Sequence, residues 1–347
     1  MSHHLSILEG AYLRDLLAQP QAVADTLVGL RSLSSLPARA LACERIVLTG
    51  MGSSLHAQTP LLLRLVRAGR TALLVETAEL IHSQSALLDE RTLVVAVSQS
   101  GCSAETLQLL DLIGARDARP FLIGVTNNPD SPLTRLSDTV VFLHAGPEFS
   151  VSCKTYLSTL VALEWLGGVI CGDDLTGIIT ELDQAAPAVE NYLTNWGTHV
   201  EQLAEQCAKL QHLFLLGRGA SLAAVGTGAL ILKESTRFHA EGMSSPAFRH
   251  GPLEMVSPGL FAVVFSGDPA TAALNEMLAC DIRAASGRAA LVGAGSDVSS
   301  FCLPAMATRL LPILEILPVQ MLSLSLAVLA GREPGRFERA TKVTVIA

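Results

Sequence analysis

A cluster of hydroxyl and amide side chains follows the apolar run Leu93–Val97. Its members are Ser98, Gln99, Ser100 and Ser103. A helical pattern begins at Ala104, so these side chains lie at a predicted helix N-terminus, where free backbone N–H groups and the helix dipole favour an anion. One N-cap needs only one hydroxyl. The cluster therefore predicts a site for a monophosphate held by neutral donors.

A second polar loop ends an earlier apolar run and reads Gly50-Met51-Gly52-Ser53-Ser54. The third glycine of a dinucleotide-binding GxGxxG is missing, and no GKS or GKT of a Walker A loop occurs. Glycines permit close approach and the hydroxyls of Ser53 and Ser54 could hold sugar hydroxyls. A simple tight turn explains the motif equally well.

The second half of the chain offers a carboxylate and an imidazole. Glu234 falls within an Ala/Leu-rich helical pattern, and His250 precedes Gly-Pro and so falls in a loop. The two could act as a proton-transfer pair. An exposed or ion-paired glutamate is the alternative for Glu234. Other histidines stand alone, and no clustered metal-binding pattern is present, so we expect no metal site.

Short apolar runs alternate with helical patterns through the first half. The runs are Arg45–Gly50, Thr71–Glu76, Leu93–Val97, Phe121–Val125 and Thr139–Leu143. This order is typical of an α/β fold with a doubly wound parallel sheet. In such a sheet, ligands bind at the carboxyl ends of the strands.

The same order recurs in the second half, which predicts a two-copy tandem repeat. Leu213 to Ser221 matches Ile46 to Ser54, and both read as an apolar run followed by Gly-x-Gly-x-Ser. Where the first copy has the serine cluster, the second has Phe265-Ser266-Gly267-Asp268. Asp268 would repel a phosphate. We therefore expect a phosphate site in the first half only.

Composition excludes several classes of protein. Of the 347 residues, 50% are apolar and 16% charged, the net charge is −8 and mean hydropathy is +0.43, which argues against disorder and against nucleic-acid binding. The apolar stretch Leu310–Ala330 contains Glu315 and two prolines, so we expect a buried helix and no membrane association. No signal peptide is visible, and the seven scattered cysteines form no CxxC pair. We expect a cytoplasmic protein without disulfides or structural zinc.

These motifs and their order along the chain resemble the double SIS (sugar isomerase) domain family. The family includes the isomerase half of glucosamine-6-phosphate synthase and SIS-type deaminases and deglycases. The resemblance rests on Ser98-Gln99-Ser100-Gly101, Leu232-Lys233-Glu234, His239-Ala240-Glu241 and Arg249-His250-Gly251-Pro252. It implies two tandem SIS domains, each a three-layer, flavodoxin-like sandwich around a parallel five-stranded sheet.

The expected boundaries are an N-terminal helical segment over 1–40, a phosphate-binding domain over 41–181, a helical connector over 182–210, a second domain over 211–330 and a tail over 331–347. The tail ends on a β-like run, Lys342–Ile346.

The resemblance also implies roles for individual residues. Substrate-binding positions are Gly52, Ser53, Ser54, Ser98, Gln99, Ser100, Ser103, Val151 and Cys153. Glu234 falls on the residue that moves a proton between C1 and C2, and His250 on a ring-opening histidine lent across a dimer interface. Glu148 matches a glutamate that precedes the pocket loop, without an assigned role.

Several positions depart from the synthase. Ile231 replaces a helix lysine, and Pro246-Ala247 replaces Gly-Glu. The C-terminal lysine, a catalytic candidate, is Lys342, one place later than in the synthase, and Thr341 holds the synthase position. No glutaminase domain is present, so glutamine-driven amination is not expected.

The sequence thus predicts a homodimeric enzyme without a cofactor that isomerises or deaminates a hexose or aminohexose 6-phosphate. A fructosamine-6-phosphate deglycase shares the same core chemistry. From another class, a non-catalytic phosphosugar-binding regulator would keep the serine cluster but would not need Glu234 and His250.

Overall fold

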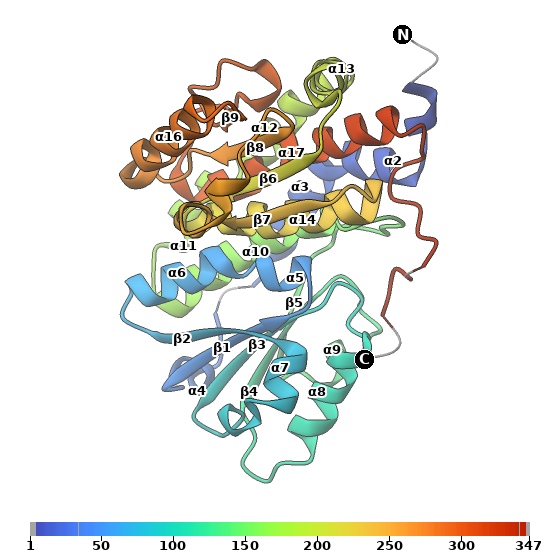
Figure 1. Ribbon diagram of the computed structural model, residues 1–347. Coiled ribbons are helices and arrows are strands. Elements are labelled where there is room, and N and C mark those ends of the chain that lie inside the picture. Colours follow the sequence, from blue (N-terminus) through green and yellow to red (C-terminus); the bar gives the residue numbers. More distant parts are fainter. Residues whose placement is uncertain (1–4, 34, 340, 345–347) are drawn as a thin grey trace. The chain divides into compact units, whose positions relative to one another are not determined.

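The first of two parallel sheets follows the predicted strands closely. The computed structural model describes residues 5–33, 35–339 and 341–344. The strands of this sheet are β1 (Arg45–Gly50), β2 (Thr71–Glu76), β3 (Thr92–Val97), β4 (Phe121–Thr126) and β5 (Thr139–Phe142). Their order is β2-β1-β3-β4-β5 (Figure 1). The predicted doubly wound parallel sheet is confirmed for the first repeat.

The second sheet has four strands among the described residues, not the predicted five. They are β6 (His212–Gly217), β7 (Ala240–Ser244), β8 (Leu260–Phe265) and β9 (Arg288–Val292). Their order is β7-β6-β8-β9. Beyond β9 a single parallel bridge joins Gly293 to Cys302. Pro304 follows closely and has no N–H to donate to a ladder, so pairing stops where the first sheet has β5.

Two further expectations need correction. The β7 segment reads Ala-Glu-Gly-Met-Ser and was not predicted as a strand, although its first two residues belong to the quoted motif His239-Ala240-Glu241. An edge strand pairs on one side only and lacks the apolar run that marks a central strand. In the tail, Lys342 to Thr344 forms no strand, and the rest of the predicted run lies outside the described residues.

The chain forms two compact units, and neither is continuous in sequence. One unit contains Gln21–Glu148, Ser152–Gln184 and Glu338–Ala347 and holds the first sheet. The other contains Met1–Pro20, Phe149–Val151 and Ala185–Phe337 and holds the second sheet. The segment Phe149–Val151 is thus three residues of one unit inserted between stretches of the other.

Helices cover both sheets. Those of the first-sheet unit are α4 (Ala38–Leu41), α5 (Ser53–His56), α6 (Thr59–Arg67), α7 (Thr77–His82), α8 (Ala104–Gly114), α9 (Pro132–Leu136), α10 (Lys154–Cys171) and α11 (Leu175–Leu182). Those of the second-sheet unit are α2 (Ala11–Leu17), α12 (Ala185–Leu193), α13 (Trp196–Cys207), α14 (Leu222–Thr236), α15 (Ser245–Arg249), α16 (Pro269–Ala284) and α17 (Leu311–Leu329). Helix α3 (Gln19–Arg31) begins in the second-sheet unit and continues into the other.

The apolar face of α8 packs on the first sheet. Leu109 and Ile113 of this helix join Val94 of β3 and Leu122 of β4 in one buried cluster. Burial of these side chains holds α8 against the strands, because each Å² of apolar surface removed from water stabilises the folded state by about 25 cal/mol. The N-terminus of α8 is thereby held at the carboxyl end of β3, where the polar cluster lies.

Helix α17 is a core helix. The stretch Thr308–Leu329 is long and apolar enough to cross a membrane by length and composition, but 89% of that apolar window is buried inside the protein. It packs against α13 and α14. The expectation of a buried helix is confirmed.

Helix α17 carries a buried carboxylic acid at Glu315. The Ser221 hydroxyl donates to Glu315 Oε1 at 2.8 Å, and among the described residues Oε2 has no hydrogen-bond partner. Burial raises the pKa of Glu315 to about 7, against the smaller lowering effect of the Ser221 hydrogen bond.

Glu315→Gln is expected to be more stable than the wild type above pH 7. In the folded state Glu315 keeps its proton up to about pH 7, whereas the unfolded chain loses it near the ordinary value of 4.5. Its stabilising contribution is therefore complete below pH 4.5 and is lost as the pH rises through 7. Glutamine stays neutral, so its advantage grows with pH to about 3 kcal/mol.

Urea unfolding of both proteins between pH 5 and pH 8 measures this difference. Glu276→Gln, a change at an exposed position of α16, serves as control and is expected to show no such trend. Parallel pH curves for the wild type and Glu315→Gln would contradict the assignment.

Candidate functional site

The predicted phosphate loop joins β3 to α8 and is folded by its own hydroxyls. Ser103 is the N-cap of α8, and its side chain accepts from Thr106 N at 3.4 Å. Ser98 Oγ accepts from Gly101 N at 3.2 Å, and Ser100 Oγ accepts from Cys102 N at 3.3 Å. A hydroxyl that accepts a bond keeps its own hydrogen to donate. The loop thus presents partly exposed hydroxyl donors at a helix N-terminus.

Gly101 is the one residue of this loop that must be glycine. Its φ is +64°, in the left-handed region, and an added Cβ would lie 2.2 Å from Ser131 Oγ and 2.6 Å from Ser131 Cβ. Its carbonyl accepts from Leu133 N at 3.2 Å. Close packing against the loop after β4 therefore sets its shape.

The loop after β4 supports the phosphate loop in two more places. Asn128 Nδ2 donates to the Ser100 carbonyl at 3.1 Å, and Asn127 N donates to the Gln99 carbonyl at 3.1 Å. Neither asparagine was among the predicted site residues. These contacts were not predicted, because they join residues almost thirty positions apart.

The segment Gly52–Ser54, which contains the first two residues of the short helix α5, lies beside the phosphate loop. It follows β1, which pairs directly with β3, so that Gly50 and Val97 are opposite each other at the carboxyl edge. A Cβ at Gly50 would lie 3.0 Å from the Val97 carbonyl. In the sheet, β1 has β2 on one side and β3 on the other, so the strand order reverses direction at β1. Parallel sheets bind ligands at the carboxyl edge beside such a switch point.

The corresponding helix N-terminus of the second repeat is already occupied. Asp268 is the N-cap of α16, and its carboxylate accepts from Ala270 N at 2.9 Å. A carboxylate there satisfies the helix and repels an anion. This geometry agrees with a phosphate site in the first repeat alone, which remains a prediction.

A buried carboxylate, Glu148, organises the start of α10. Glu148 Oε1 accepts from Cys153 N at 3.0 Å and from Thr155 N at 3.1 Å, and the Thr155 hydroxyl donates to Oε2 at 2.8 Å. Lys342 Nζ donates to the same oxygen at 2.7 Å. The Glu148 side chain is fully buried. A helix N-terminus and an ammonium group together balance its charge.

Lys342 brings the C-terminal tail into this unit. Two residues later the Thr344 carbonyl accepts from Ala104 N at 3.0 Å, in the first turn of α8. The tail therefore reaches the helix N-terminus that the phosphate loop precedes. The Lys342 ammonium neutralises Glu148 here, and its catalytic role remains a prediction.

The side chains of Val151 and Cys153 are buried. Val151 is 1% exposed and Cys153 0% exposed, and Cys153 Sγ donates to Glu148 Oε1 at 3.5 Å. Any contact of these two residues with a ligand would therefore come from the backbone or follow a movement of the loop.

Glu234 and His250 belong to the second-sheet unit. Glu234 is half-buried in the last turn of α14, rather than mid-helix. His250 is exposed and ends α15, where His250 N donates to the Ala247 carbonyl at 3.0 Å. The neighbouring Arg249 pairs with Asp281 at 2.6 Å, which fixes α15 against α16.

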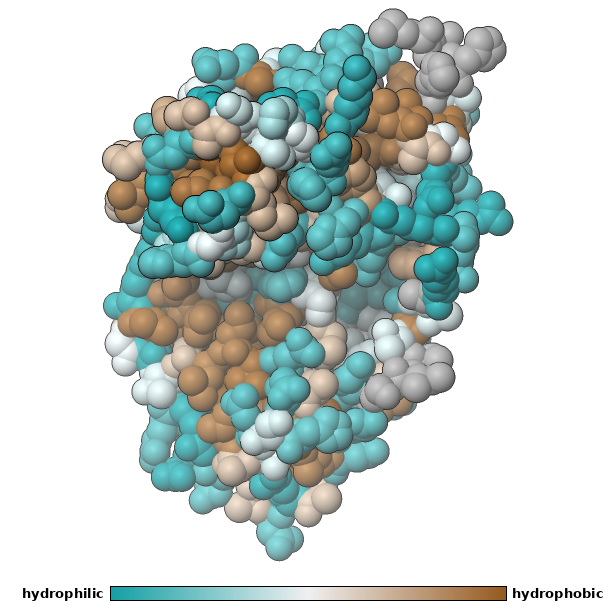
Figure 2. Space-filling model, in the orientation of Figure 1, coloured by the Kyte–Doolittle hydropathy of each residue, from teal (hydrophilic) through white to brown (hydrophobic). Residues whose placement is uncertain are grey.

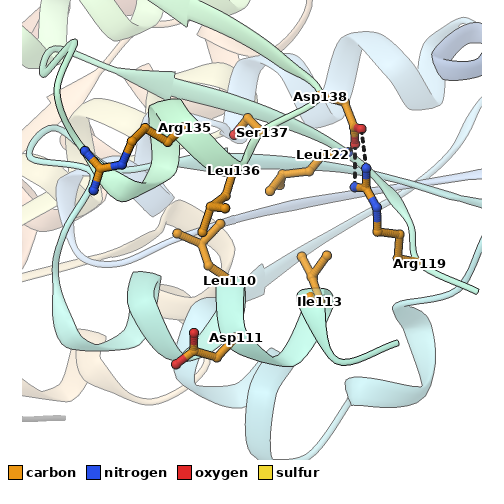
Figure 3. Close-up of a pocket in the computed structure, with 10 residues that line it drawn as sticks. Leu110, Asp111, Ile113, Arg119, Leu122, Arg135, Leu136, Ser137 and Asp138 are labelled. Carbon is orange, nitrogen blue, oxygen red and sulfur yellow. Dashed lines mark hydrogen bonds and ion pairs between the residues drawn. The ribbon is translucent and has the colours of Figure 1, made fainter. Parts of the chain in front are cut away.

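Within the described residues, no group of three or more His, Cys, Asp or Glu side chains could hold a metal ion. A surface pocket of about 600 Å³ is lined by residues of α8, α9 and the starts of β4 and β5 (Figure 3). Arg119 and Asp138 form a bidentate ion pair in it, at 2.9 and 2.7 Å. Since Leu122 and Asp138 lie at the amino ends of their strands, this pocket is at the edge opposite the polar loops.

Comparison with known proteins agrees with the repeat. A family model described as "SIS domain" matches residues 41–167 and again 206–330. The glutamine–fructose-6-phosphate aminotransferase (isomerizing) of Pyrococcus horikoshii is 30% identical over 348 residues, covering 96% of this chain and 57% of that protein. The chain thus spans a little over half the length of this curated relative.

Solved structures show the same fold. The C-terminal domain of glucosamine-fructose-6-phosphate aminotransferase from Francisella tularensis superposes with a TM-score of 0.85 at 25% identity, covering 94% of this chain and 98% of that one. Tagatose-6-phosphate ketose/aldose isomerase from Escherichia coli gives 0.81 at 20% identity, covering 95% and 96%. Glucosamine-6-phosphate deaminase from Thermotoga maritima gives 0.79 at 18%, covering 97% and 100%. The last two show the fold alone.

Gly101→Ala is expected to distort the phosphate loop. The new Cβ would meet Ser131 and force a left-handed φ on alanine, so we expect a stability loss of about 1–3 kcal/mol. We also expect inorganic phosphate and sugar phosphates to bind at least about tenfold more weakly, a loss of 1.4 kcal/mol or more.

The matched control is Gly114→Ala at the other end of α8, where an added Cβ meets nothing within 4 Å. Thermal unfolding and calorimetric titration compare the two variants. Equal behaviour of both would show that Gly101 does not shape an anion site.

Proposed function

Because the chain belongs to the SIS domain family, we propose that it is an enzyme acting on a hexose or aminohexose 6-phosphate through proton transfer between C1 and C2. The observation that carries this proposal is the loop Ser98–Ser103. It aims neutral donors and a helix N-terminus at the carboxyl edge of the first sheet, beside Ser53 and Ser54. A phosphate group fits the first loop and sugar hydroxyls fit the second.

The proposed reaction needs a base, an acid and an open sugar chain. His250 protonates the ring oxygen as the ring opens, which gives the free carbonyl at C1. The Glu234 carboxylate takes the proton from C2, and the electron pair forms a C1=C2 double bond while O1 gains a proton. Glu234 then returns its proton to C1, and the C2 hydroxyl releases its proton to solvent as C2 becomes the ketone, which balances the proton that O1 took up.

Deamination and deglycation use the same transfer. With an amino group on C2, moving the proton to C1 leaves a C2 imine, which water hydrolyses to ketose and ammonia. With an amine on C1 of a ketose, moving the proton from C1 to C2 leaves a C1 imine, which water hydrolyses to aldose and free amine. The fructosamine-6-phosphate deglycase is therefore the alternative enzyme, and Glu234 serves all three reactions.

One observation favours the alternative of a non-catalytic phosphosugar-binding regulator. Lys342 pairs with the buried Glu148 carboxylate at 2.7 Å, and an ammonium group is not a nucleophile. Ile231 also stands where the synthase has a lysine. A regulator would bind sugar phosphates through Ser98–Ser103 without turnover.

We further propose a cytoplasmic homodimer in which His250 acts in the partner's site. His250 is exposed, as a residue lent to a neighbour must be. The first-sheet unit also exposes apolar side chains over the edge strand β2 and α6, where Val66 is 54% and Leu73 39% exposed (Figure 2). An exposed apolar patch on a sheet edge is typical of a surface that a second chain covers.

Glu234→Gln is expected to lower turnover by about 10²–10⁴-fold with little change in affinity, because glutamine keeps the shape of the side chain but accepts no proton. Ser100→Ala is expected to do the reverse and raise KM more than it lowers kcat. Glucosamine 6-phosphate and fructose 6-phosphate are the first substrates, with ammonia and ketose as products. Near-normal turnover by Glu234→Gln would place the base elsewhere.

Mixed dimers of Ser100→Ala and His250→Ala chains are expected to regain part of the lost activity. In such a dimer one site receives an intact phosphate loop from one chain and an intact histidine from the other. Activity after subunit exchange, followed with two different affinity tags, measures the recovery. No recovery despite proven exchange would show that each chain uses its own histidine.

A further inference from the structure

The buried carboxylate of Asp15, in α2, holds the short segment Phe149–Val151. Asp15 is 4% exposed, and its Oδ2 accepts from Phe149 N at 2.8 Å and from Ser150 N at 3.3 Å. Hydrogen bonds from N–H groups to an ionised carboxylate are among the strongest in proteins. Asp15 therefore fixes the backbone that leads directly into Val151.

The segment is tied onward to the helix that carries Glu234. The Ser150 hydroxyl donates to the Gly335 carbonyl at 2.9 Å, and Gly335 N donates to the Ser235 carbonyl at 3.1 Å. Ser235 follows Glu234 in the last turn of α14. A continuous path of hydrogen bonds thus runs from Asp15 to the residue beside the proposed base, all within one compact unit.

Gly335 is tightly packed against Ser150 and Tyr12, so the backbone along this path cannot move freely. Its φ is +72°, and an added Cβ would lie 2.0 Å from Ser150 Oγ and 3.1 Å from Tyr12 Cβ. Tyr12 is fully buried and its hydroxyl shares a hydrogen bond with Ser323 Oγ at 3.0 Å, which fixes α2 to α17. Asp15 therefore acts from a helix that is itself anchored in the core.

We propose that Asp15 is a positioning residue that holds Phe149–Val151 in register with the last turn of α14. The inference rests on the proposed function, since it gives Asp15 the task of setting the pocket loop against Glu234. A displacement of about 1 Å between a substrate and its base lowers the rate by about 10²-fold. Loss of Asp15 should therefore slow the chemistry without weakening phosphate binding, which belongs to the other unit.

The test compares Asp15→Ala, Asp15→Asn and Ser150→Ala with the wild type. Asparagine keeps an oxygen that can accept both N–H bonds, so it should rescue most of the activity, whereas alanine should lower kcat about 10–100-fold. Ser150→Ala breaks only the link to Gly335 and should lower kcat less than Asp15→Ala. The control is Asp25→Asn, at an exposed position in α3.

Two further measurements separate positioning from a loss of folded protein. The Kd of glucitol 6-phosphate, which has no carbonyl to react, should stay within twofold of the wild type in every variant. Hydrogen exchange should become faster at the amides of Phe149, Ser150 and Gly335 in Asp15→Ala and stay unchanged at Ser98–Ser103. A fall in kcat together with a proportional loss of binding sites would indicate a purely structural role and overturn the inference.

The two proposals fail in different ways. A wild-type chain that binds glucitol 6-phosphate but turns over none of the hexose and aminohexose phosphates overturns the proposed function and the role of Asp15 with it. A wild-type chain that is active while Asp15→Ala keeps kcat within twofold overturns the role of Asp15 alone. The predicted pattern is slow chemistry in Asp15→Ala, rescue by Asp15→Asn and unchanged phosphate affinity.

Discussion

The buried charge of Glu148 is the constraint on which the first-sheet unit depends. Removing a carboxylate from water costs several kcal/mol unless donors surround it. The first turn of α10, the Thr155 hydroxyl and the Lys342 ammonium supply those donors. One charge therefore sets where α10 begins and where the tail runs. The tail in turn meets α8 through Thr344, so the candidate anion site is built beside a segment that is distant in sequence.

The two repeats have the same strand order but different polar groups at the equivalent edge. In the first repeat the hydroxyls of Ser98, Ser100 and Ser103 shape a loop that leaves donors for a ligand. In the second, Asp268 caps its own helix and Glu315 accepts from Ser221 inside the core. Neutral donors favour binding an anion, whereas the carboxyl groups of Asp268 and Glu315 accept from the protein's own N–H and O–H groups. The fold is thus retained in both repeats, whereas the polar groups at this edge differ.

The strands that are buried on both faces of a sheet were predicted from the sequence. The contacts between residues far apart in the sequence were not. Strands such as β1, β3 and β8 are continuous apolar runs because helices cover both sides of a parallel sheet. The edge strand β7 lacks that pattern, and the expected fifth strand of the second sheet fails near Pro304. The polar loops and the start of α8 were predicted from local signals. The hydrogen bonds between Glu148 and Lys342 and between Asp15 and Phe149 join residues more than a hundred positions apart. No local sequence pattern indicates such contacts.

The discontinuity of the two compact units has a consequence during synthesis. Gln19 at the start of α3 exchanges two amide hydrogen bonds with Gln320 of α17, across 301 positions, at 3.0 and 2.8 Å. A ribosome that adds about 5–20 residues per second delivers Gln320 many seconds after Gln19 has left the exit tunnel. During that time Tyr12 of α2 and Gln19 of α3 lack Ser323 and Gln320, the hydrogen-bond partners that α17 supplies. The second-sheet unit therefore cannot complete the contacts of its first helices until α17 has been made.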